Sequence, residues 1–485
     1  MNQDRPSREQ LLKLARENPE GIVDLVLMLW DRVDKLEAEL AELKRNSRNS
    51  SKPPSSDKNN PNKPEKKHRK CGNKRKPGGQ QGHDGHTLRK VAEPDRVITH
   101  KLPVACGQCG ASLREVKVKA QDCESRQMFD LPRKIEMEVI EHRAEVGICP
   151  CCGKKVKAPF PDELKAPVQY GERIKALVIY LQTYQLLPCE RLSELCGDVF
   201  NCSISPATVA NFLKRGGARA GPLVEKIKKK IQEAPYIHCD ETGLNLFGKN
   251  HWLHTASTPE LTFLHIDEKR GYPALQAMGI LEGYQGWAIH DFFSSYYRIE
   301  GLLHGLCNAH HLRDLTYVDE DLAQQWAGDM IGLLLEAKGL KEREQAGGRR
   351  VGVKTLERLQ NRYFGILEEG YAVNPEPQRR PGQRGRIKRG KALNLLERFS
   401  ERHEEVMAFL IHDLPFDNNE AERDLRMMKT KQKISGCFRS RPHAVAFANL
   451  RSIIASARKQ AVNVLDILRA TLSDQHLAHR LLFET

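Results

Sequence analysis

The sequence predicts a multidomain protein in which helical and cysteine-bearing segments precede a mixed α/β core. Three observations carry this prediction. A heptad repeat of apolar residues runs through the first 45 residues, two Cys-x-x-Cys pairs follow, and the hydrophobic period changes from helical to alternating near residue 235. A chain of 485 residues is long enough for about three folded units with connecting segments.

Residues 7–45 are predicted to form one helix whose apolar side chains repeat every three or four residues. The repeat consists of Val26, Leu29, Val33, Leu36, Leu40 and Leu43. Valines at two a positions with leucines at d favour a parallel coiled coil, which makes the chain a homodimer. Because the repeat covers only about three heptads, a helix packed on its own domain is the alternative.

Residues 46–94 combine proline, glycine, asparagine and serine with a dense positive charge. The chain has a net charge of +15, and residues 44–90 contain 15 Lys or Arg against three acidic residues, a net +12. Such a composition buries too little apolar surface to offset the entropy of ordering, so we expect a disordered linker. A basic block of this density predicts a polyanionic partner, most often nucleic acid, and a solvated tether is the alternative.

Residues 95–160 contain two Cys-x-x-Cys pairs, each followed by glycine. The pairs are Cys106 with Cys109 and Cys149 with Cys152. Four thiolates complete a tetrahedral Zn²⁺ site and leave no position open for chemistry, so the predicted zinc is structural. Cys151 is the alternative to Cys152 as a ligand. A β-hairpin over Val116–Val139 is expected to fill the space between the pairs.

The thirteen cysteines also indicate a compartment. With no secretory signal in the sequence, the thiols are expected to stay reduced in a cytoplasmic protein. The longest apolar run, Ile22–Trp30, is interrupted by Asp24 and is too short to span a bilayer, so no membrane is expected as a partner.

Residues 171–217 are predicted to be helical. They include two short helices, over Glu190–Phe200 and Pro206–Arg215, and Ser205 followed by proline is typical of a helix start. Two short helices joined by a tight turn suit a helix-turn-helix that binds DNA, and an ordinary α-hairpin is the alternative.

From residue 235 onward, alternating hydrophobicity predicts a sheet. The predicted elements, in order, are strands Tyr236–Leu246, Trp252–Ser257 and Leu261–Ile266, a helix Pro273–Leu281 and a fourth strand Gly286–Asp291. This order indicates a mixed sheet in an α/β or α+β core, which we place at 235–435. Residues 302–412 are predicted to be an all-helical insertion, and 436–485 a helical C-terminal region.

Three carboxylates in this core are candidates for a metal site. Asp240 lies in the first predicted strand, Asp291 ends the fourth, and Glu422 begins a helix expected to be capped by Asp417 or Asn418. An unpaired charge on an apolar strand is costly, which distinguishes the two aspartates from solvated surface carboxylates. Carboxylates from two strands and a helix can hold two Mg²⁺ or Mn²⁺ ions, an arrangement that suits in-line phosphoryl displacement.

Two further patterns lie near these carboxylates. Cys307 and His310, three residues apart, can meet on one helical turn, either as a buried pair that supports the fold or as metal ligands. A basic cluster follows Glu422 and is a candidate for contacts with DNA phosphates. The cluster consists of Lys429, Lys431, Lys433, Arg439 and Arg441.

The sequence resembles the transposases of the insertion sequence 66 family, bacterial DDE transposases with a ribonuclease H-like core. The resemblance covers nearly the whole chain in order. Its motifs are the leucine-rich first helix, Asn46–Asp57, Pro77–His83, the two cysteine pairs, Asp240–Gly243 with His251–His254, His290–Asp291, and Asp417–Asn419 with Ala421–Arg423.

The resemblance implies a DNA transposase whose catalytic domain, residues 235–435, contains a helical insertion at about 302–412. It implies Asp240, Asp291 and Glu422 as the metal-binding triad for Mg²⁺-dependent strand cleavage and strand transfer. Glu420, two residues from Glu422, is expected to face another side of the helix.

The partners implied by the resemblance are terminal inverted repeats, target DNA and small accessory proteins, so the protein is expected at the nucleoid when bound to DNA. Two other functions stay open. One is a non-catalytic, zinc-containing DNA-binding regulator, and the other is a structure-selective nuclease on the same core.

Overall fold

The computed structural model describes residues 8–43, 88–115, 124–132, 135–378, 387 and 389–484. The described residues divide into two units. One unit holds residues 8–43, 140–198 and those from 202 onward, and the other holds those from 88 to 139 together with 199–201. No helix in the described part of the chain is both long enough and apolar enough to cross a membrane.

The N-terminal segment forms two helices, α1 (Arg8–Glu17) and α2 (Pro19–Leu43), so the prediction of one continuous helix was wrong. The break falls at Asn18, whose Oδ1 accepts a hydrogen bond from the amide of Gly21 at 2.9 Å. Asn18 thereby caps α2, and Pro19 occupies the first helical position, where its missing N–H costs nothing. Four side chains of the predicted seam are exposed in the single chain, namely Val26, Leu29, Val33 and Leu36.

Residues 46–87, most of the predicted basic linker, lie outside the described residues, and residues 88–94 adopt neither helix nor strand. The predicted hairpin over Val116–Val139 is wrong for the part that is described, since 124–132 and 135–139 contain no strand. The hairpin lies later, where β1 (Val146–Ile148) pairs antiparallel with β2 (Lys155–Lys157). Its turn is the second cysteine pair, whose glycine supplies the left-handed backbone that the turn requires.

Helices α3 (Glu172–Ile179), α4 (Cys189–Phe200) and α5 (Pro206–Gln232) precede the sheet. The predicted start of α5 is confirmed, because Ser205 Oγ accepts a hydrogen bond from the amide of Thr208 at 3.2 Å. The predicted end at Arg215 was wrong. The helix continues to Gln232, since its apolar stripe is buried along its whole length.

The prediction of a mixed α/β core is confirmed by a five-stranded sheet in the order β5-β4-β3-β6-β7. Strands β3, β4 and β5 are antiparallel neighbours, whereas β6 and β7 run parallel to β3. The strands are β3 (Tyr236–Leu246), β4 (Lys249–Ser257), β5 (Thr262–Asp267), β6 (Trp287–His290) and β7 (Leu303–Leu306), with helix α6 (Tyr272–Met278) after β5. The four predicted strands are confirmed. The fifth, β7, shows that residues 302–412 are not all helical.

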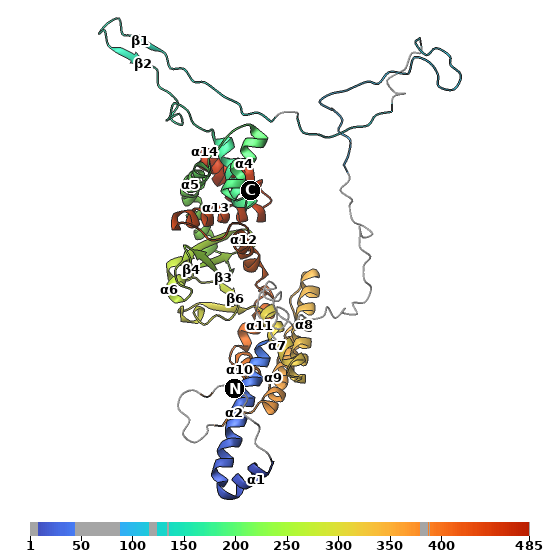
Figure 1. Ribbon diagram of the computed structural model, residues 1–485, viewed down its shortest axis with the longest axis vertical. Helices are drawn as coiled ribbons and strands as arrows, with labels where there is room; N and C mark the ends of the chain where they lie inside the picture. Colours follow the sequence, from blue (N-terminus) through green and yellow to red (C-terminus); the bar gives the residue numbers. More distant parts are fainter. Residues whose placement is uncertain are drawn as a thin grey trace. The chain divides into compact units, whose positions relative to one another are not determined.

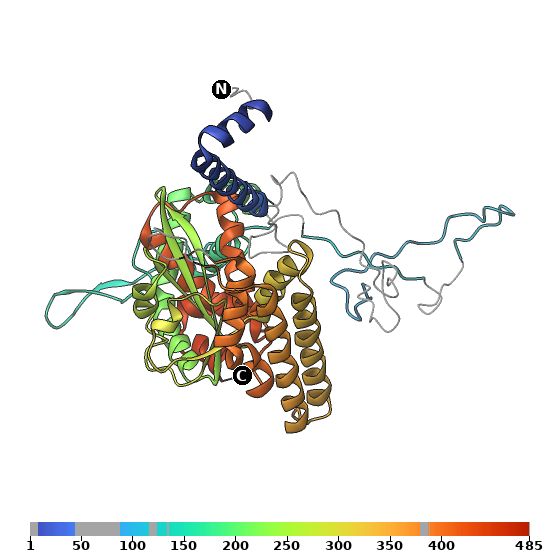
Figure 2. The same cartoon turned by 90° about the horizontal axis from the view of Figure 1, so that it is seen from below.

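The helices after β7 form two groups. The first packs around its own apolar core beside the sheet (Figures 1 and 2). It consists of α7 (Asn308–Glu320), α8 (Gln325–Ala346), α9 (Val353–Val373), α10 (Lys391–Glu401) and α11 (His403–Ile411). The second group returns to the sheet. It consists of α12 (Asn419–Ser435), α13 (Arg441–Lys459), α14 (Val464–Ser473) and α15 (Gln475–Phe483).

Helix α13 fixes the sheet by satisfying the free amides of its edge strand. Ser452 Oγ accepts a hydrogen bond from the amide of Leu264, and Ser456 Oγ accepts one from the amide of Thr262, both at 3.0 Å. An uncovered edge strand is a site of unwanted strand pairing, and these bonds close it. Helix α5 lies along α13, with Gly217 against Ala446.

Replacement of Gly217 by alanine is expected to destabilise the protein, because the new Cβ would overlap the Cα and Cβ of Ala446. The matched control is Gly332→Ala, an exposed position inside α8 where an added Cβ has no atom within 4 Å. Both variants gain the same helix propensity, so their difference isolates the overpacking, which costs about 1–3 kcal/mol. Thermal unfolding measures it, and equal midpoints for the two variants would contradict the close helix crossing.

Candidate active site

Asp240 and Asp291 lie at the same level of neighbouring parallel strands. The register pairs His238 of β3 with Ile289 of β6, and each aspartate is two residues further along its own strand. Asp291 follows the last residue of β6 directly. The sheet therefore brings together two carboxylates that are 51 positions apart in the sequence.

The carboxylates of this region act on one another electrostatically. The pKa of Asp240 is raised well above its usual value, first by burial and then by the negative charges of Glu241, Asp291 and Glu422. A hydrogen bond from the amide of Glu241 to Asp240 Oδ1, at 2.8 Å, acts in the opposite direction. Three predicted site residues from β3, the end of β6 and α12 are thus gathered in one region, where a bound cation would relieve their repulsion.

Glu422 lies in the first turn of α12, with its carboxylate turned inward. Glu422 Oε1 is buried and has no hydrogen-bond partner among the described residues. The guanidinium nitrogen Arg313 Nη2 and the imidazole nitrogen His310 Nε2 each lie 3.7 Å from this oxygen. The carboxylate therefore retains its capacity to bind a cation.

Glu420, the alternative to Glu422, is already neutralised. Its carboxylate lies 3.0 Å from Lys459 Nζ and also pairs with Arg423. Burial acts to raise the pKa of Glu420, but Lys459 and then Arg423 lower it overall. These ion pairs point Glu420 toward α13, away from the side of α12 that carries Glu422.

Asn418 connects three elements of the site, which was not expected from the sequence. It is fully buried, and its Nδ2 donates to the carbonyl of Cys239 at 2.7 Å while its Oδ1 pairs with His238 Nδ1 at 3.0 Å. Its backbone amide donates to Cys307 Sγ at 3.1 Å. Asn418 stands at the predicted cap position of α12, but its side chain binds β3 instead. The Asp-Asn-Asn motif was the only sequence signal at this position, and a local pattern does not reveal the distant partners of Asn418.

Glu241, an acidic residue, is the second site residue that the sequence reasoning missed. Its carboxylate pairs with Arg270 at 2.9 Å and accepts a hydrogen bond from the Tyr296 hydroxyl at 3.1 Å. Burial and then Asp291 raise the pKa of Glu241 to about 7, although Arg270 acts to lower it. The cost of a charge in an apolar strand, which drew attention to Asp240, applies equally to its neighbour.

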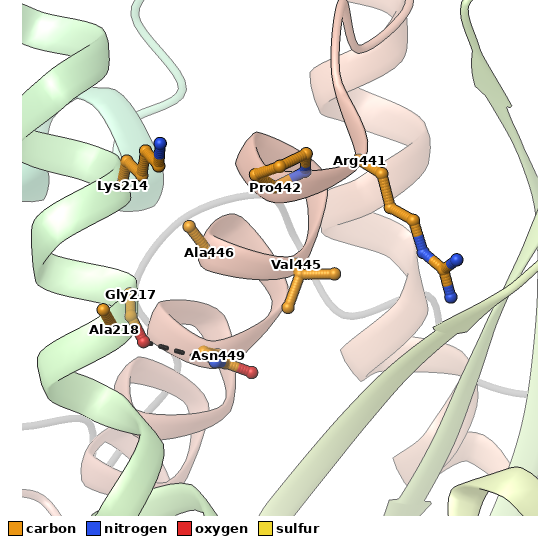
Figure 3. A pocket seen from close by; sticks show the side chains of 8 residues that line it. All are labelled: Lys214, Gly217, Ala218, Arg441, Pro442, Val445, Ala446 and Asn449. Atoms are coloured by element: carbon orange, nitrogen blue, oxygen red, sulfur yellow. Dashed lines mark hydrogen bonds between the residues drawn. The ribbon is translucent and has the colours of Figure 1, made fainter.

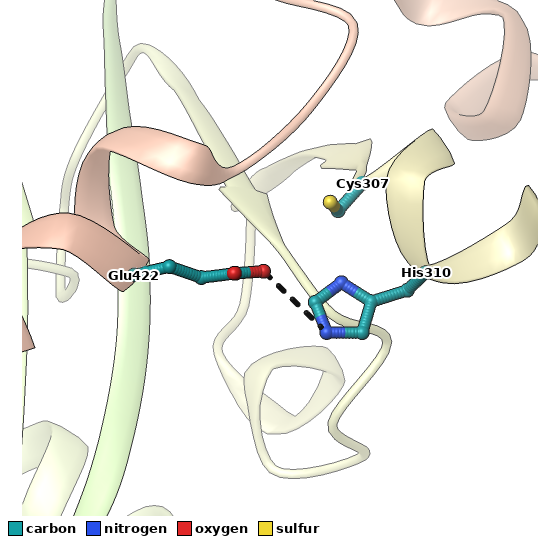
Figure 4. Close-up of side chains that lie close together, drawn as sticks. All are labelled: Cys307, His310 and Glu422. Atoms are coloured by element: carbon teal, nitrogen blue, oxygen red, sulfur yellow. Dashed lines mark ion pairs between the residues drawn. The ribbon is translucent and has the colours of Figure 1, made fainter. Parts of the chain in front are cut away.

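Cys307, His310 and Glu422 form a compact group. One potential ligand atom from each lies within 4.8 Å of the other two. Figure 4 shows the sulfur at the start of α7, the imidazole one turn later, and the carboxylate reaching from α12 toward both. Glu422 of the predicted triad therefore joins Cys307 and His310, the pair expected on one helical turn.

Each cysteine pair forms a tight turn with the same hydrogen bonds. The glycine after each pair, Gly110 or Gly153, donates its amide to the carbonyl of Cys106 or Cys149 at 2.9 Å and has a positive φ. Hydrogen bonds from backbone amides inside each turn lower the pKa of Cys106 and of Cys149. Each turn therefore favours a thiolate. The two pairs belong to different units.

The basic cluster after Glu422 is mostly exposed, as DNA contact requires. Lys431, also predicted as a DNA-binding residue, is the exception because its side chain is buried. Only 7% of Lys431 is exposed, and its ammonium group lies 3.9 Å from the centre of the Phe438 ring. Lys431 lies on the buried, apolar side of α12, where the aromatic ring contacts its ammonium group in place of water. The exposed members are Lys429, Lys433, Arg439 and Arg441.

A pocket of about 390 Å³ lies between α5 and α13 (Figure 3). Lys214 and Arg441 supply its positive charges, and none of its described lining residues carries a carboxylate. The amide of Asn449 bridges the two helices through the carbonyl of Gly217 at 3.2 Å. The lining residues are Lys214, Gly217, Ala218, Arg441, Pro442, Val445, Ala446 and Asn449. The pocket and the acidic region share no residue.

Comparison with known proteins places these features in a family. The family described as Transposase IS66 family matches residues 167–446, more than half of the chain, including the sheet and all three predicted triad residues. A family of unknown function matches residues 8–89. No curated protein matches the chain. Transposases bind DNA and cut and join its strands. With its sheet, its acidic residues and most of its helices inside the matched range, the chain belongs to the IS66 family of transposases.

Proposed function

We propose that the chain is a transposase of the DDE type, in which Asp240, Asp291 and Glu422 hold two Mg²⁺ or Mn²⁺ ions. The main support for this proposal is the raised pKa of Asp240, to which burial and the charges of the other two carboxylates contribute. The strand order supports a ribonuclease H-like core, with three antiparallel strands followed by two that run parallel to the first.

The donor set fits a hard divalent cation. All three side chains offer oxygen, and they come from elements held together by the sheet and by Asn418. Glu422 Oε1 is buried and has no hydrogen-bond partner among the described residues. Two such ions, when bound, activate the attacking oxygen and stabilise the leaving oxygen of an in-line displacement. In the reaction proposed here, water attacks at the element end, and the freed 3′-OH then attacks target DNA.

Asp240→Asn, Asp291→Asn and Glu422→Gln are each expected to reduce cleavage of DNA that carries the element ends by about a hundredfold or more. Charge stabilisation by bound metal is worth several kcal/mol, and each change removes one charged ligand. The matched control is Glu420→Gln, which removes an ion pair with Lys459 but no proposed ligand.

Full activity in any one of the three variants would remove that residue from the triad. Strand transfer by the wild-type chain is measured alongside cleavage. Cutting without joining would indicate a structure-selective nuclease, and DNA binding without cutting would indicate a regulator.

Exposed positive charge supports DNA binding around the same core. Lys429, Lys433, Arg439 and Arg441 follow Glu422 along the chain, and Lys214 and Arg215 lie on the exposed side of α5. We assign α4 and α5 to a helix-turn-helix that meets terminal inverted repeats, and the basic linker 46–94 to contacts with DNA phosphates.

The two cysteine pairs are proposed to share one structural Zn²⁺. Backbone amides that lower the pKa of Cys106 and Cys149 favour the thiolate that zinc requires. Cys109 and Cys152 would complete the site.

Cys149→Ser is expected to lower the zinc content of the purified chain by one ion, because a structural site needs all four ligands. Cys151→Ser is the matched control and should keep the wild-type content. Metal analysis by mass spectrometry measures both. If Cys151→Ser lost the ion and Cys152→Ser kept it, the ligand assignment within the second pair would be reversed.

Helix α2 is proposed to form a parallel coiled-coil homodimer. Its support is the exposed seam of Val26, Leu29, Val33 and Leu36, which a second copy would cover.

Leu29→Glu combined with Leu36→Glu is expected to convert the dimer to a monomer, because the charges would face one another in the seam. Met28→Glu is the control, since Met28 is equally exposed but lies off the seam. Sedimentation measures the molar mass of each variant. A wild-type chain that sediments as a monomer, or a double variant that stays dimeric, contradicts the coiled coil.

A further inference from the structure

We propose that Cys307, His310 and Glu422 form a second metal site, for a softer divalent cation of the Zn²⁺ type. The claim that this site competes with catalysis rests on the proposed function, in which Glu422 also serves the Mg²⁺ site. The binding of zinc itself does not depend on that function.

Backbone hydrogen bonds hold the segments that carry these three side chains close together. The amide of Cys307 donates to the carbonyl of His290 at 2.9 Å, which holds the start of α7 beside the end of β6. The amide of Asn308 donates to the carbonyl of Phe416 at 3.0 Å, which ties the same point to the segment that leads into α12. His310 follows Cys307 by one turn, and Glu422 lies in the first turn of α12. These bonds determine that the side chains converge (Figure 4).

Two donor atoms of the group make no hydrogen bond within the described residues, while Cys307 Sγ accepts one from the amide of Asn418. His310 Nδ1 and Glu422 Oε1 are both buried and lack hydrogen-bond partners within the described ranges. The distance of 3.7 Å between His310 Nε2 and Glu422 Oε1 is too long for a hydrogen bond. Buried polar atoms without partners are costly, so a cation among them would stabilise the arrangement.

The types of donor select the cation. A thiolate, an imidazole and a carboxylate are ligands of zinc, whereas Mg²⁺ takes oxygen ligands. Tetrahedral zinc, with Zn–S of about 2.3 Å and Zn–N of about 2.0 Å, places its donor atoms about 3.5 Å apart. The three atoms, now within 4.8 Å of one another, would close by about 1 Å. Three protein ligands leave the fourth position to water.

Because Glu422 belongs to both proposed metal sites, zinc binding should affect catalysis. Glu422 is the only member of the group that also belongs to the proposed Mg²⁺ triad, and one side chain cannot serve both places fully. Zinc at Cys307 and His310 would draw the carboxylate toward α7 and away from Asp240 and Asp291. We therefore expect Zn²⁺ to inhibit Mg²⁺-dependent cleavage.

Metal content tests the site without reference to activity. The full chain is loaded with Zn²⁺ and dialysed, and we expect Cys307→Ser and His310→Gln each to hold one zinc ion fewer than the wild type. Cys196→Ser is the matched control, because Cys196 is a buried cysteine of α4 outside the group. Thermal unfolding checks that each variant is folded. Wild-type zinc content in folded Cys307→Ser and His310→Gln would overturn the proposal.

A measurement on the wild-type chain avoids the folding of variants altogether. Zinc should slow the carbethoxylation of His310, detected by peptide mass spectrometry, whereas Mg²⁺ alone should not. An unchanged rate with saturating zinc would contradict the site.

Zinc titration of the cleavage reaction then separates this proposal from the function on which its consequence rests. The zinc concentration for half inhibition should rise by at least about tenfold in Cys307→Ser, since loss of a metal partner typically costs that much affinity. No cleavage in Mg²⁺ with the expected zinc loss would contradict the DDE function and leave the zinc site intact. Normal cleavage with unchanged zinc content would contradict the zinc site alone.

Discussion

The buried amide of Asn418 is the contact on which the acidic region depends. It joins β3 through the carbonyl of Cys239 and the imidazole of His238, and its backbone amide reaches Cys307 at the start of α7. Each of these partners is more than a hundred positions from Asn418 in the chain. Because a buried amide loses its water on folding, each of these bonds is needed to offset that loss, and the geometry is correspondingly narrow. Glu422 follows Asn418 by one helical turn, so the contacts of Asn418 also fix the position of Glu422.

A second polar network holds α12 from its other side. The carboxylate of Asp424 accepts hydrogen bonds from Ser257 at 2.6 Å, from Thr262 at 2.8 Å and from Lys459 at 2.9 Å. Lys459 also binds Glu420, so α13 supplies the cation that neutralises both carboxylates on that side of α12. Glu420 and Asp424 are thereby neutralised by one lysine, whereas Glu422, the proposed metal ligand, lies on the neighbouring side of α12. The C-terminal helix α13 is therefore part of the apparatus that orients the site.

The sequence could predict the features that depend on local pattern. The strands β3 to β6 followed from alternation, and Asp240 and Asp291 stood out because a charge interrupts an apolar strand. What it could not predict depends on distant partners. Gly217 lies just beyond the predicted helix end at Arg215, but in the structure it continues α5 and allows α13 to approach closely. Strand β7 is four residues long and contains a glycine, so its pattern was too short to detect. The sequence indicated that Lys431 is a surface charge, but in the structure its ammonium group lies against the Phe438 ring.

The position of the helices α7 to α11 between Asp291 and Glu422 bears on the biosynthesis of this protein. The ribosome releases the two aspartates first, and the insertion must emerge and fold before Glu422 can reach them. Contacts between residues so far apart in sequence form late, because the intervening chain must first be closed into a loop. An incomplete translation product would carry the aspartate pair on its sheet without the glutamate. Under the proposed function, a chain able to cut DNA therefore arises only after nearly all of it has been made.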